Sequence, residues 1–238
     1  MTAATTPVTA EPKASVWEDF LDIFYAPAQV FARRMDGKFG LALLILVILS
    51  AVLWYAAAQV LEPAIAGEMR RGMAQNPNVT PEQIAAFSGG IGQWIFLGTA
   101  IVMMPIFVLL TGLALWLVGK LFDSTQSLSQ SFMVATYANV PKLLGLLLMT
   151  VQGLLMDVST ADRLYDVAFS PARFAAEGSS ELVLVLLSRF EIFVIWATVL
   201  LGIGLHITGK VPKGKAMIAA FLVWAIAALP AVLGALRS

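Results

Sequence analysis

Hydrophobic residues along this chain gather in five long runs that polar stretches separate. The runs cover approximately residues 39–61, 91–118, 132–156, 182–207 and 216–236. A hydrocarbon core about 30 Å thick needs about 20 apolar residues in a helix that rises 1.5 Å per residue, and each run is long enough. Because backbone groups in lipid must satisfy one another, runs of this length predict helices. The pattern therefore predicts an all-α, polytopic integral membrane protein with five transmembrane helices.

The segment before the first run has two parts with different patterns. Residues 1–14 show no apolar periodicity, and we expect a disordered tail there. Residues 15–38 begin with Ser15 and Glu18 at the spacing of a capping box, and apolar residues then recur at helical spacing. We interpret this part as amphipathic helices that lie on the membrane surface ahead of a transmembrane domain at 39–236. The alternative is that these helices pack on other parts of the protein.

The two faces of the first surface helix are expected to differ. The residues expected to contact the membrane surface are Trp17, Phe20 and Phe24. Aromatic residues next to a membrane span favour the interface between lipid and water. The opposite face carries the acidic residues Glu18, Asp19 and Asp22.

Small residues in two of the runs predict where helices pack closely. In the second run they recur every seven positions, at Gly98, Pro105, Gly112 and Gly119. Heptad spacing places such residues near one face, where a second helix can approach. Pro105 also removes a backbone hydrogen bond and predicts a kink. In the fourth run, Thr198 and Gly202 share a face with Glu191, and we expect them to pack against another helix.

Basic residues between the runs predict the orientation in the membrane. With a cytoplasmic N-terminus, the cytoplasmic side holds Lys13, Arg33, Arg34, Lys38, Lys120, Lys210, Lys213 and Lys215. The far side then holds Arg70, Arg71, Arg163, Arg173 and Arg237. Positive charge favours the cytoplasmic side, so the pattern predicts a cytoplasmic N-terminus in a cell (inner) membrane. Five spans then place the C-terminus on the far side.

Composition excludes several classes of site. Hydrophobic residues make up 59% of the chain and charged residues 13%, and the formal net charge is zero, so no basic field indicates nucleic acid. The chain lacks cysteine and has one histidine, His206, which excludes thiolate catalysis and a multi-histidine metal site. It also lacks hydrolase and phosphate-loop motifs. We therefore expect no enzyme activity, no cofactor and no metal. His206 is expected to be an interface residue.

Three charged residues lie inside predicted spans: Lys142, Arg189 and Glu191. Each costs about 2.5–3.5 kcal/mol at mid-membrane, so each needs a partner or a route to water. Lys142 and Glu191 lie at similar depth in antiparallel spans and could meet, with Asn139 on the same face as Lys142. One interpretation is a polar pocket for an ion, a proton or a lipid head group. The other is a structural pair that fixes the register of the two helices.

The chain resembles the bacterial branch of the Yip family (Ypt-interacting proteins). The resemblance rests on the proline-led stretch at 26–31, on Tyr-Ala-Asn-Val-Pro at 137–141, on the aromatic run at 190–196 and on the basic turn before the final apolar run. It implies five spans with the termini on opposite sides and carries no catalytic residues. Related eukaryotic proteins bind Rab-type GTPases, but their Asp-Leu-Tyr-Gly-Pro signature is absent here.

Two hypotheses for function follow from these features. The first is a non-enzymatic membrane protein that organises membrane or recruits partners. Its expected partners are membrane lipids and either another membrane protein or a second copy of the chain. The second is a small transporter or channel built around Lys142, Glu191 and Asn139.

Overall fold

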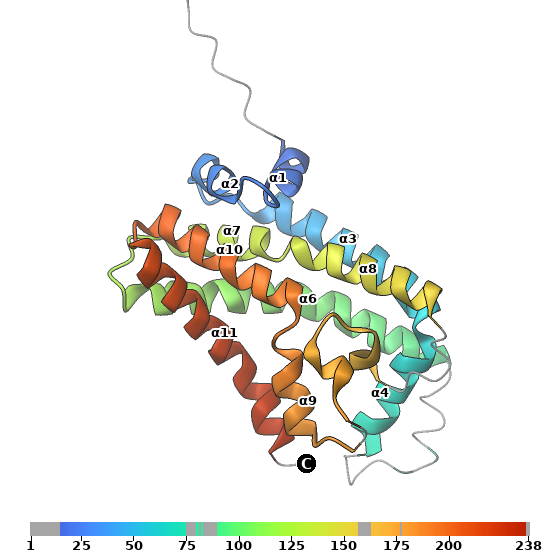
Figure 1. Ribbon diagram of the computed structural model, residues 1–238. Coiled ribbons are helices and arrows are strands. Elements are labelled where there is room, and N and C mark those ends of the chain that lie inside the picture. The colour runs from blue at the N-terminus through green and yellow to red at the C-terminus, as the bar shows by residue number, and fades with distance from the viewer. Residues whose placement is uncertain are drawn as a thin grey trace, which may run out of the picture.

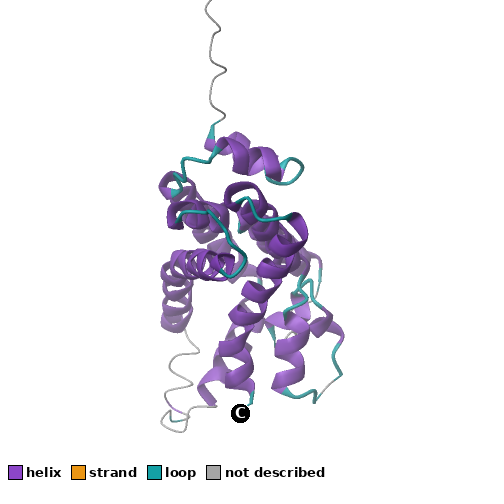
Figure 2. Cartoon of the chain, turned by 90° about the vertical axis from the view of Figure 1, so that its left-hand side faces the viewer, coloured by secondary structure: helices purple, strands orange, loops and turns teal. Residues whose placement is uncertain are grey.

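The computed structural model describes residues 15–74, 80, 82, 90–156, 163–176 and 178–236. The tail predicted at 1–14 lies outside these residues. Within them the chain is helical, and Figure 2 shows helices joined by loops without a strand in the part that is described. Five helical segments are long and apolar enough to cross a membrane: Gly40–Val60, Ile101–Lys120, Leu128–Leu155, Ile192–Gly209 and Lys213–Ala235. The prediction of an all-α protein with five candidate spans is confirmed.

The helices follow the hydrophobic runs, with two short helices ahead of them. The N-terminal pair is α1 (Val16–Asp22) and α2 (Pro27–Arg33), and the first long helices are α3 (Gly40–Val60), α4 (Glu62–Ala74) and α6 (Gly90–Lys120). The remaining helices are α7 (Leu128–Ala138), α8 (Pro141–Leu155), α9 (Glu181–Ser188), α10 (Ile192–Gly209) and α11 (Lys213–Ala235). Two 3₁₀ turns, η2 (Leu164–Val167) and η3 (Pro171–Phe174), lie between α8 and α9.

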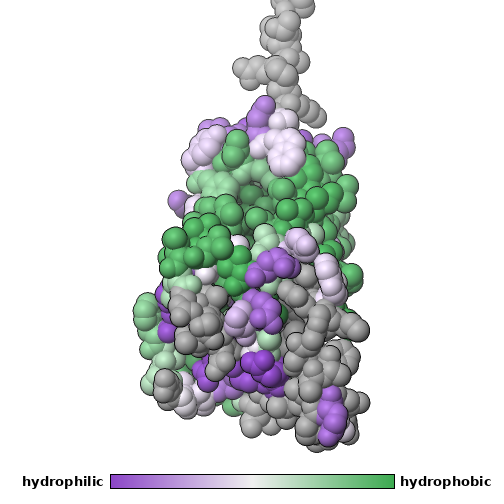
Figure 3. Space-filling model, turned by 90° about the vertical axis from the view of Figure 1, so that its right-hand side faces the viewer, coloured by the Kyte–Doolittle hydropathy of each residue, from purple (hydrophilic) through white to green (hydrophobic). Residues whose placement is uncertain are grey.

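Two opposite ends of the bundle are visible in Figure 1. The short helices α1 and α2 lie at the top, and the turn between α10 and α11 lies at the upper left, whereas α9 lies at the bottom and α4 at the lower right. On the face shown in Figure 3, hydrophobic residues form a band across the middle of the molecule, with hydrophilic residues above and below it. This distribution is the one expected of a helical bundle that sits in a bilayer.

Local sequence explains where α1 and α2 begin. The Ser15 hydroxyl accepts a hydrogen bond from the backbone N–H of Glu18, and the Glu18 side chain accepts one from the backbone N–H of Ser15. The predicted capping box is therefore present. Pro27 occupies the first position of α2, where its missing N–H has no helical partner to lose.

The third hydrophobic run is interrupted. The helix that begins at Leu128 ends at Ala138, and α8 starts at Pro141. Because Pro141 has no N–H, the carbonyl of Tyr137 needs another donor, and the backbone N–H of Val140 supplies it at 3.1 Å. The run is thus two helices joined at Asn139 and Val140.

The fourth hydrophobic run differs from the prediction of one continuous helix. The structure divides it into α9 and α10, with a break at residues 189–191. Glu191 stands at the start of α10, where its Oε2 accepts a hydrogen bond from the backbone N–H of Val194 at 2.8 Å. A side-chain acceptor at this position satisfies a backbone N–H that has no partner within the helix. The residue expected at mid-helix is therefore a helix cap.

The small residues of α6 have different surroundings. A Cβ added at Gly112 would lie 2.7 Å from Cδ1 of Phe132 on α7, and one added at Gly119 would lie 3.1 Å from Leu205 on α10. A Cβ at Gly98 would have no neighbour within 4 Å among the described residues. The helix continues through Pro105, which is half-buried. Of these three glycines, the two in the second half of α6 are therefore the ones in close contact with other helices.

The packing residues expected on the fourth run lie on α10. A Cβ added at Gly202 would approach Sδ of Met217 on α11 to 2.6 Å, so α10 and α11 lie close together there. The Thr198 hydroxyl is half-buried and donates to the carbonyl of Val194 at 2.8 Å. Its hydrogen bond stays within α10.

Candidate functional site

A buried carboxylate joins α1 to the bundle. Asp19 is completely buried, and its Oδ1 accepts a hydrogen bond from Nε of Arg33 at 2.6 Å. Its Oδ2 accepts from Nε of Arg34 at 2.5 Å and from the Tyr137 hydroxyl at 3.1 Å. Because Tyr137 belongs to α7, this cluster connects both short helices to a membrane-spanning segment. The sequence pattern had placed Asp19 on a polar outer face.

A second carboxylate supports the connection from α1 to the end of α2. Asp22 accepts hydrogen bonds from the Tyr25 hydroxyl and from the guanidinium of Arg33. These bonds stabilise the charged form and hold the pKa of Asp22 below its usual value. When folding lowers the pKa of a carboxyl group, the charged group stabilises the folded state at neutral pH. This stabilisation is lost as the pH falls through the lowered pKa. Docking of α1 on α2 should therefore weaken only under acidic conditions.

Aromatic contacts cover the inner side of α1. Phe20 is buried with its ring edge-on to Tyr137, the centroids 5.9 Å apart. Phe24 is half-buried and packs edge-on against Trp196 of α10 at 5.3 Å. Both residues were expected at the membrane surface, but these contacts turn Phe20 and much of Phe24 toward the protein. The alternative stated for this segment, packing on the protein, describes this face of α1.

The outer side of α1 carries a separate row of apolar residues. Trp17, Leu21 and Tyr25 follow one another four residues apart and are 57%, 66% and 74% exposed. We call these three residues the outer row. Trp17 and Leu21 lie four residues apart in α1 and therefore on one face, and Tyr25 follows in the turn after the helix. Of the three expected membrane-contact residues, Trp17 is the one in the outer row.

Hydrogen bonds between loops assemble one end of the bundle. Ser129 donates to the carbonyl of Gly37 at 2.7 Å, and the Gln130 amide donates to the carbonyl of Met35 at 2.8 Å. The backbone N–H of Thr125 donates to the carbonyl of Gly209 at 3.0 Å. These bonds join the segment after α2, the turn before α7 and the turn after α10. The exposed lysines of this end, which we call the basic end, are Lys38, Lys120, Lys210, Lys213 and Lys215.

A buried polar network fixes the same end from within. The Gln126 amide donates to the Thr208 hydroxyl at 2.6 Å, and its oxygen accepts from the Ser131 hydroxyl at 2.8 Å. His206 lies in the last turn of α10, with its Nδ1 2.7 Å from the carbonyl of Val211. This contact gives the single histidine a structural position at the interface end of α10.

The break in the third run opens a cavity on the other side of the bundle. Before the break α7 packs along α6, whereas beyond it α8 packs on α3 and α10. The helix α8 therefore diverges from α6, and a cavity of about 490 Å³ lies between α3, α6, α8 and the start of α10. The break residue Asn139 lines this cavity, and its amide donates to the carbonyl of Ala135 at 2.7 Å.

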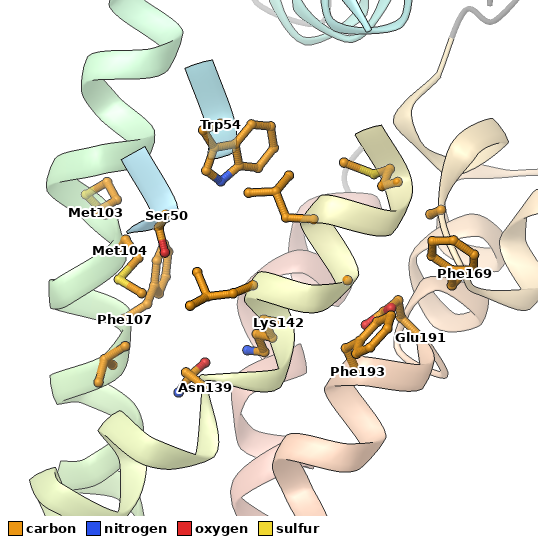
Figure 4. Close-up of a pocket in the computed structure, with 16 residues that line it drawn as sticks. Ser50, Trp54, Met103, Met104, Phe107, Asn139, Lys142, Phe169, Glu191 and Phe193 are labelled. Atoms are coloured by element: carbon orange, nitrogen blue, oxygen red, sulfur yellow. The ribbon is translucent and has the colours of Figure 1, made fainter. Parts of the chain in front are cut away.

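The cavity brings the three expected pocket residues together. Asn139, Lys142 and Glu191 all line it. Figure 4 shows the Lys142 ammonium on the side of Asn139, while Glu191 lies beside Phe193. Within the part of the chain that is described, no ion pair joins Lys142 to Glu191. They share a cavity, and the carboxylate of Glu191 is held by the start of α10.

Arg189 is fixed at the break between α9 and α10. Its guanidinium lies over the ring of Trp224 on α11 and donates to the Trp224 carbonyl at 3.2 Å. The indole N–H of Trp224 in turn donates to the carbonyl of Arg189 at 3.2 Å. This reciprocal contact holds the arginine on α11 instead of leaving it extended toward the outer surface.

Comparison with known proteins places this architecture in a family. No solved structure matches the chain. A segment of 156 residues is 28% identical to "Membrane protein YknW" of Bacillus subtilis (strain 168), a match that covers 66% of this chain and 62% of that protein. The pattern of the Yip1 domain matches residues 21–234, which takes in α2 and all five candidate spans. The chain is thus a multi-pass membrane protein that belongs to the Yip1 domain family.

Proposed function

We propose that the protein is a non-enzymatic membrane scaffold that organises the lipid surface at its basic end. The observation that carries this proposal is the outer row, which stays exposed although the other side of α1 is fixed to the bundle. Trp and Tyr favour the interface between lipid and water, and a shallow apolar helix face can enter the head-group region. Nearby cations such as Lys38 attract anionic lipid.

The docked position of α1 matters for this role. A free amphipathic helix binds and leaves a membrane independently of the rest of a protein. Here Asp19 and Phe20 hold α1 at a fixed place on the bundle, so the outer row would enter one leaflet at a fixed position beside the spans. Insertion into one leaflet alone expands that leaflet and favours curvature.

Single-cysteine labelling tests this contact, because the chain has no native cysteine. An environment-sensitive fluorophore on L21C should be quenched by lipid-borne nitroxides when the full chain is reconstituted in vesicles with anionic lipid. The same fluorophore on Q29C, an exposed polar position of α2, should respond to aqueous iodide. The double variant Trp17→Ser, Leu21→Ser should fold but lose any effect on vesicle shape. Equal iodide access at both positions would contradict the proposal.

We also propose that the basic end faces the cytoplasm. Its exposed lysines include Lys38, whose side chain is 83% exposed, and the positive side of a membrane protein favours the cytoplasm. A cysteine in place of Lys38 should react with a membrane-impermeant maleimide only after cells are opened. A cysteine in place of Phe174, an exposed residue of η3 between α8 and α9, should react in intact cells. The reverse pattern would invert the orientation.

The cavity supports a second candidate, a small transporter. Lys142, Glu191 and Asn139 line one cavity among membrane-spanning helices, as a polar translocation site would require. In that case the double variant Lys142→Met, Glu191→Gln should fold but abolish ion or proton flux into proteoliposomes. Under the scaffold proposal, the same variant should leave the effect on vesicle shape unchanged.

A further inference from the structure

The ammonium of Lys142 faces the cavity without a partner among the described residues. It takes part in none of the hydrogen bonds or ion pairs that the described chain shows, although its side chain is accessible from the cavity. A charged group at membrane depth is costly unless another charge or water compensates it. A cavity that contains such a group is therefore suited to a ligand that brings the opposite charge.

The charged residues near Lys142 do not remove the need for a ligand of opposite charge. Among the described residues that line the cavity, Lys142 and Glu191 are the charged ones. Glu191 already accepts the backbone N–H of Val194 and caps α10, and the positive end of that helix offsets part of its charge. Because this carboxylate is engaged at the start of α10, the ammonium of Lys142 is left to interact with a ligand.

The remaining walls of the cavity fit an alkyl chain. Met103, Met104 and Phe107 line it from α6, and Leu146 and Met149 line it from α8. Methionine side chains are flexible and adapt to irregular apolar surfaces. The volume of about 490 Å³ falls within the range of about 300–1,000 Å³ that is typical of pockets for small molecules.

We propose that this cavity binds an anionic amphiphile, with its head group at Lys142 and Asn139 and its alkyl chain between α6 and α8. The head group is a carboxylate or a phosphate, so a free fatty acid and a single-chain phospholipid share the required chemistry. The divergence of α8 from α6 at the helix break forms the space for the chain, and the same break places Asn139 beside the ammonium (Figure 4). This site is distinct from the outer row of α1.

Equilibrium binding to the purified full chain in maltoside detergent tests the proposal. The probe is radiolabelled oleate, with lysophosphatidylglycerol and the uncharged monoolein as competitors. Loss of one charge-assisted contact should weaken oleate binding at least about tenfold in Lys142→Met. Lys142→Arg should retain binding, because it keeps a positive charge in the cavity. Lys215→Met, an exposed lysine variant at the basic end, should bind as the unchanged chain does.

A spectroscopic readout locates the ligand. Trp54 lines the cavity, so dibromostearate should quench part of the tryptophan fluorescence, and Trp54→Phe should remove that part. Stronger competition by lysophosphatidylglycerol than by excess unlabelled oleate would identify a phosphate as the head group. Weaker competition would identify a carboxylate. Either result supports the proposal. Equal competition by monoolein, or unchanged oleate binding in Lys142→Met, would overturn it. Failure of the outer-row experiment would leave this result unaffected.

Discussion

Replacement of Asp19 by alanine should release α1 and α2 from the bundle and lower the stability of the protein by about 3–5 kcal/mol. Its buried carboxylate accepts hydrogen bonds from Arg33, Arg34 and Tyr137. The substitution removes the buried acceptor of all three groups, although Arg33 keeps its bond to Asp22. Breaking a buried ion pair typically costs about 3–5 kcal/mol. Hydrogen–deuterium exchange should rise in peptides that cover residues 16–34, and the melting temperature in detergent should fall.

A surface carboxylate provides the matched control. Asp36 lies near Lys38 with 3.6 Å between Oδ2 and Nζ, and the lysine side chain is 83% exposed. Exposed ion pairs contribute about 0–1 kcal/mol, so Asp36→Ala should leave exchange in α1 and α2 nearly unchanged. If both alanine variants behaved alike, the Asp19 cluster would not be what holds these helices in place.

The position of Asp19 shows a limit of prediction from sequence. The periodicity of α1 indicated a helix with apolar and acidic faces, and the capping box indicated where it begins. Nothing in that local pattern separates a solvated acidic face from a buried ion pair. The partner Tyr137 lies 118 residues away in the sequence, and only the tertiary fold brings its hydroxyl to Asp19.

The membrane spans were predictable because hydrocarbon thickness fixes a minimum length of apolar sequence. The helix breaks were harder to predict, because residues on both sides of them are apolar. Pro141 gave a local signal, since it frees a carbonyl one turn earlier. The break before Ile192 lacks a neighbouring glycine or proline, and Glu is an unusual N-cap residue. The charged pair Arg189 and Glu191 was the available signal, and we had interpreted it as charge inside a continuous span.

The depth of Lys142 and Glu191 in their spans predicted one part of their arrangement. Counting residues from the ends of two antiparallel spans indicated a common depth, and both residues line one cavity. The count could not show that Glu191 is a helix cap, because that depends on the break. The distinction matters for function, since a lysine that lacks an ion-pair partner in the described chain can interact with a ligand.

Substitution of Gly112 by alanine should destabilise the protein by about 1–3 kcal/mol. The added Cβ would lie 2.7 Å from Cδ1 of Phe132, 3.1 Å from its Cα and 3.1 Å from the carbonyl oxygen of Ser131. Two of these three atoms belong to the backbone of α7, so a change of rotamer cannot relieve the contact. Overpacking of this kind forces helices apart at a cost of about 1–3 kcal/mol. A thermal melt in detergent measures the loss.

Substitution of Gly98 by alanine should instead increase the stability of the protein. Gly98 shares the heptad face of Gly112, but a Cβ there meets no atom within 4 Å in the part of the chain that the structure describes. Alanine is favoured over glycine inside a helix by about 0.5–1 kcal/mol, so Gly98→Ala should raise the melting temperature slightly. Comparison of the two variants therefore distinguishes a glycine that packs within one chain from a glycine that packs only against a second copy of the chain. If Gly98→Ala lowered stability or shifted the protein from a larger species to a monomer, that end of α6 would be an interface between copies. Sequence spacing alone assigns the same role to both glycines. In the structure, α7 packs along α6 before α8 diverges from it, and this arrangement assigns close packing to Gly112.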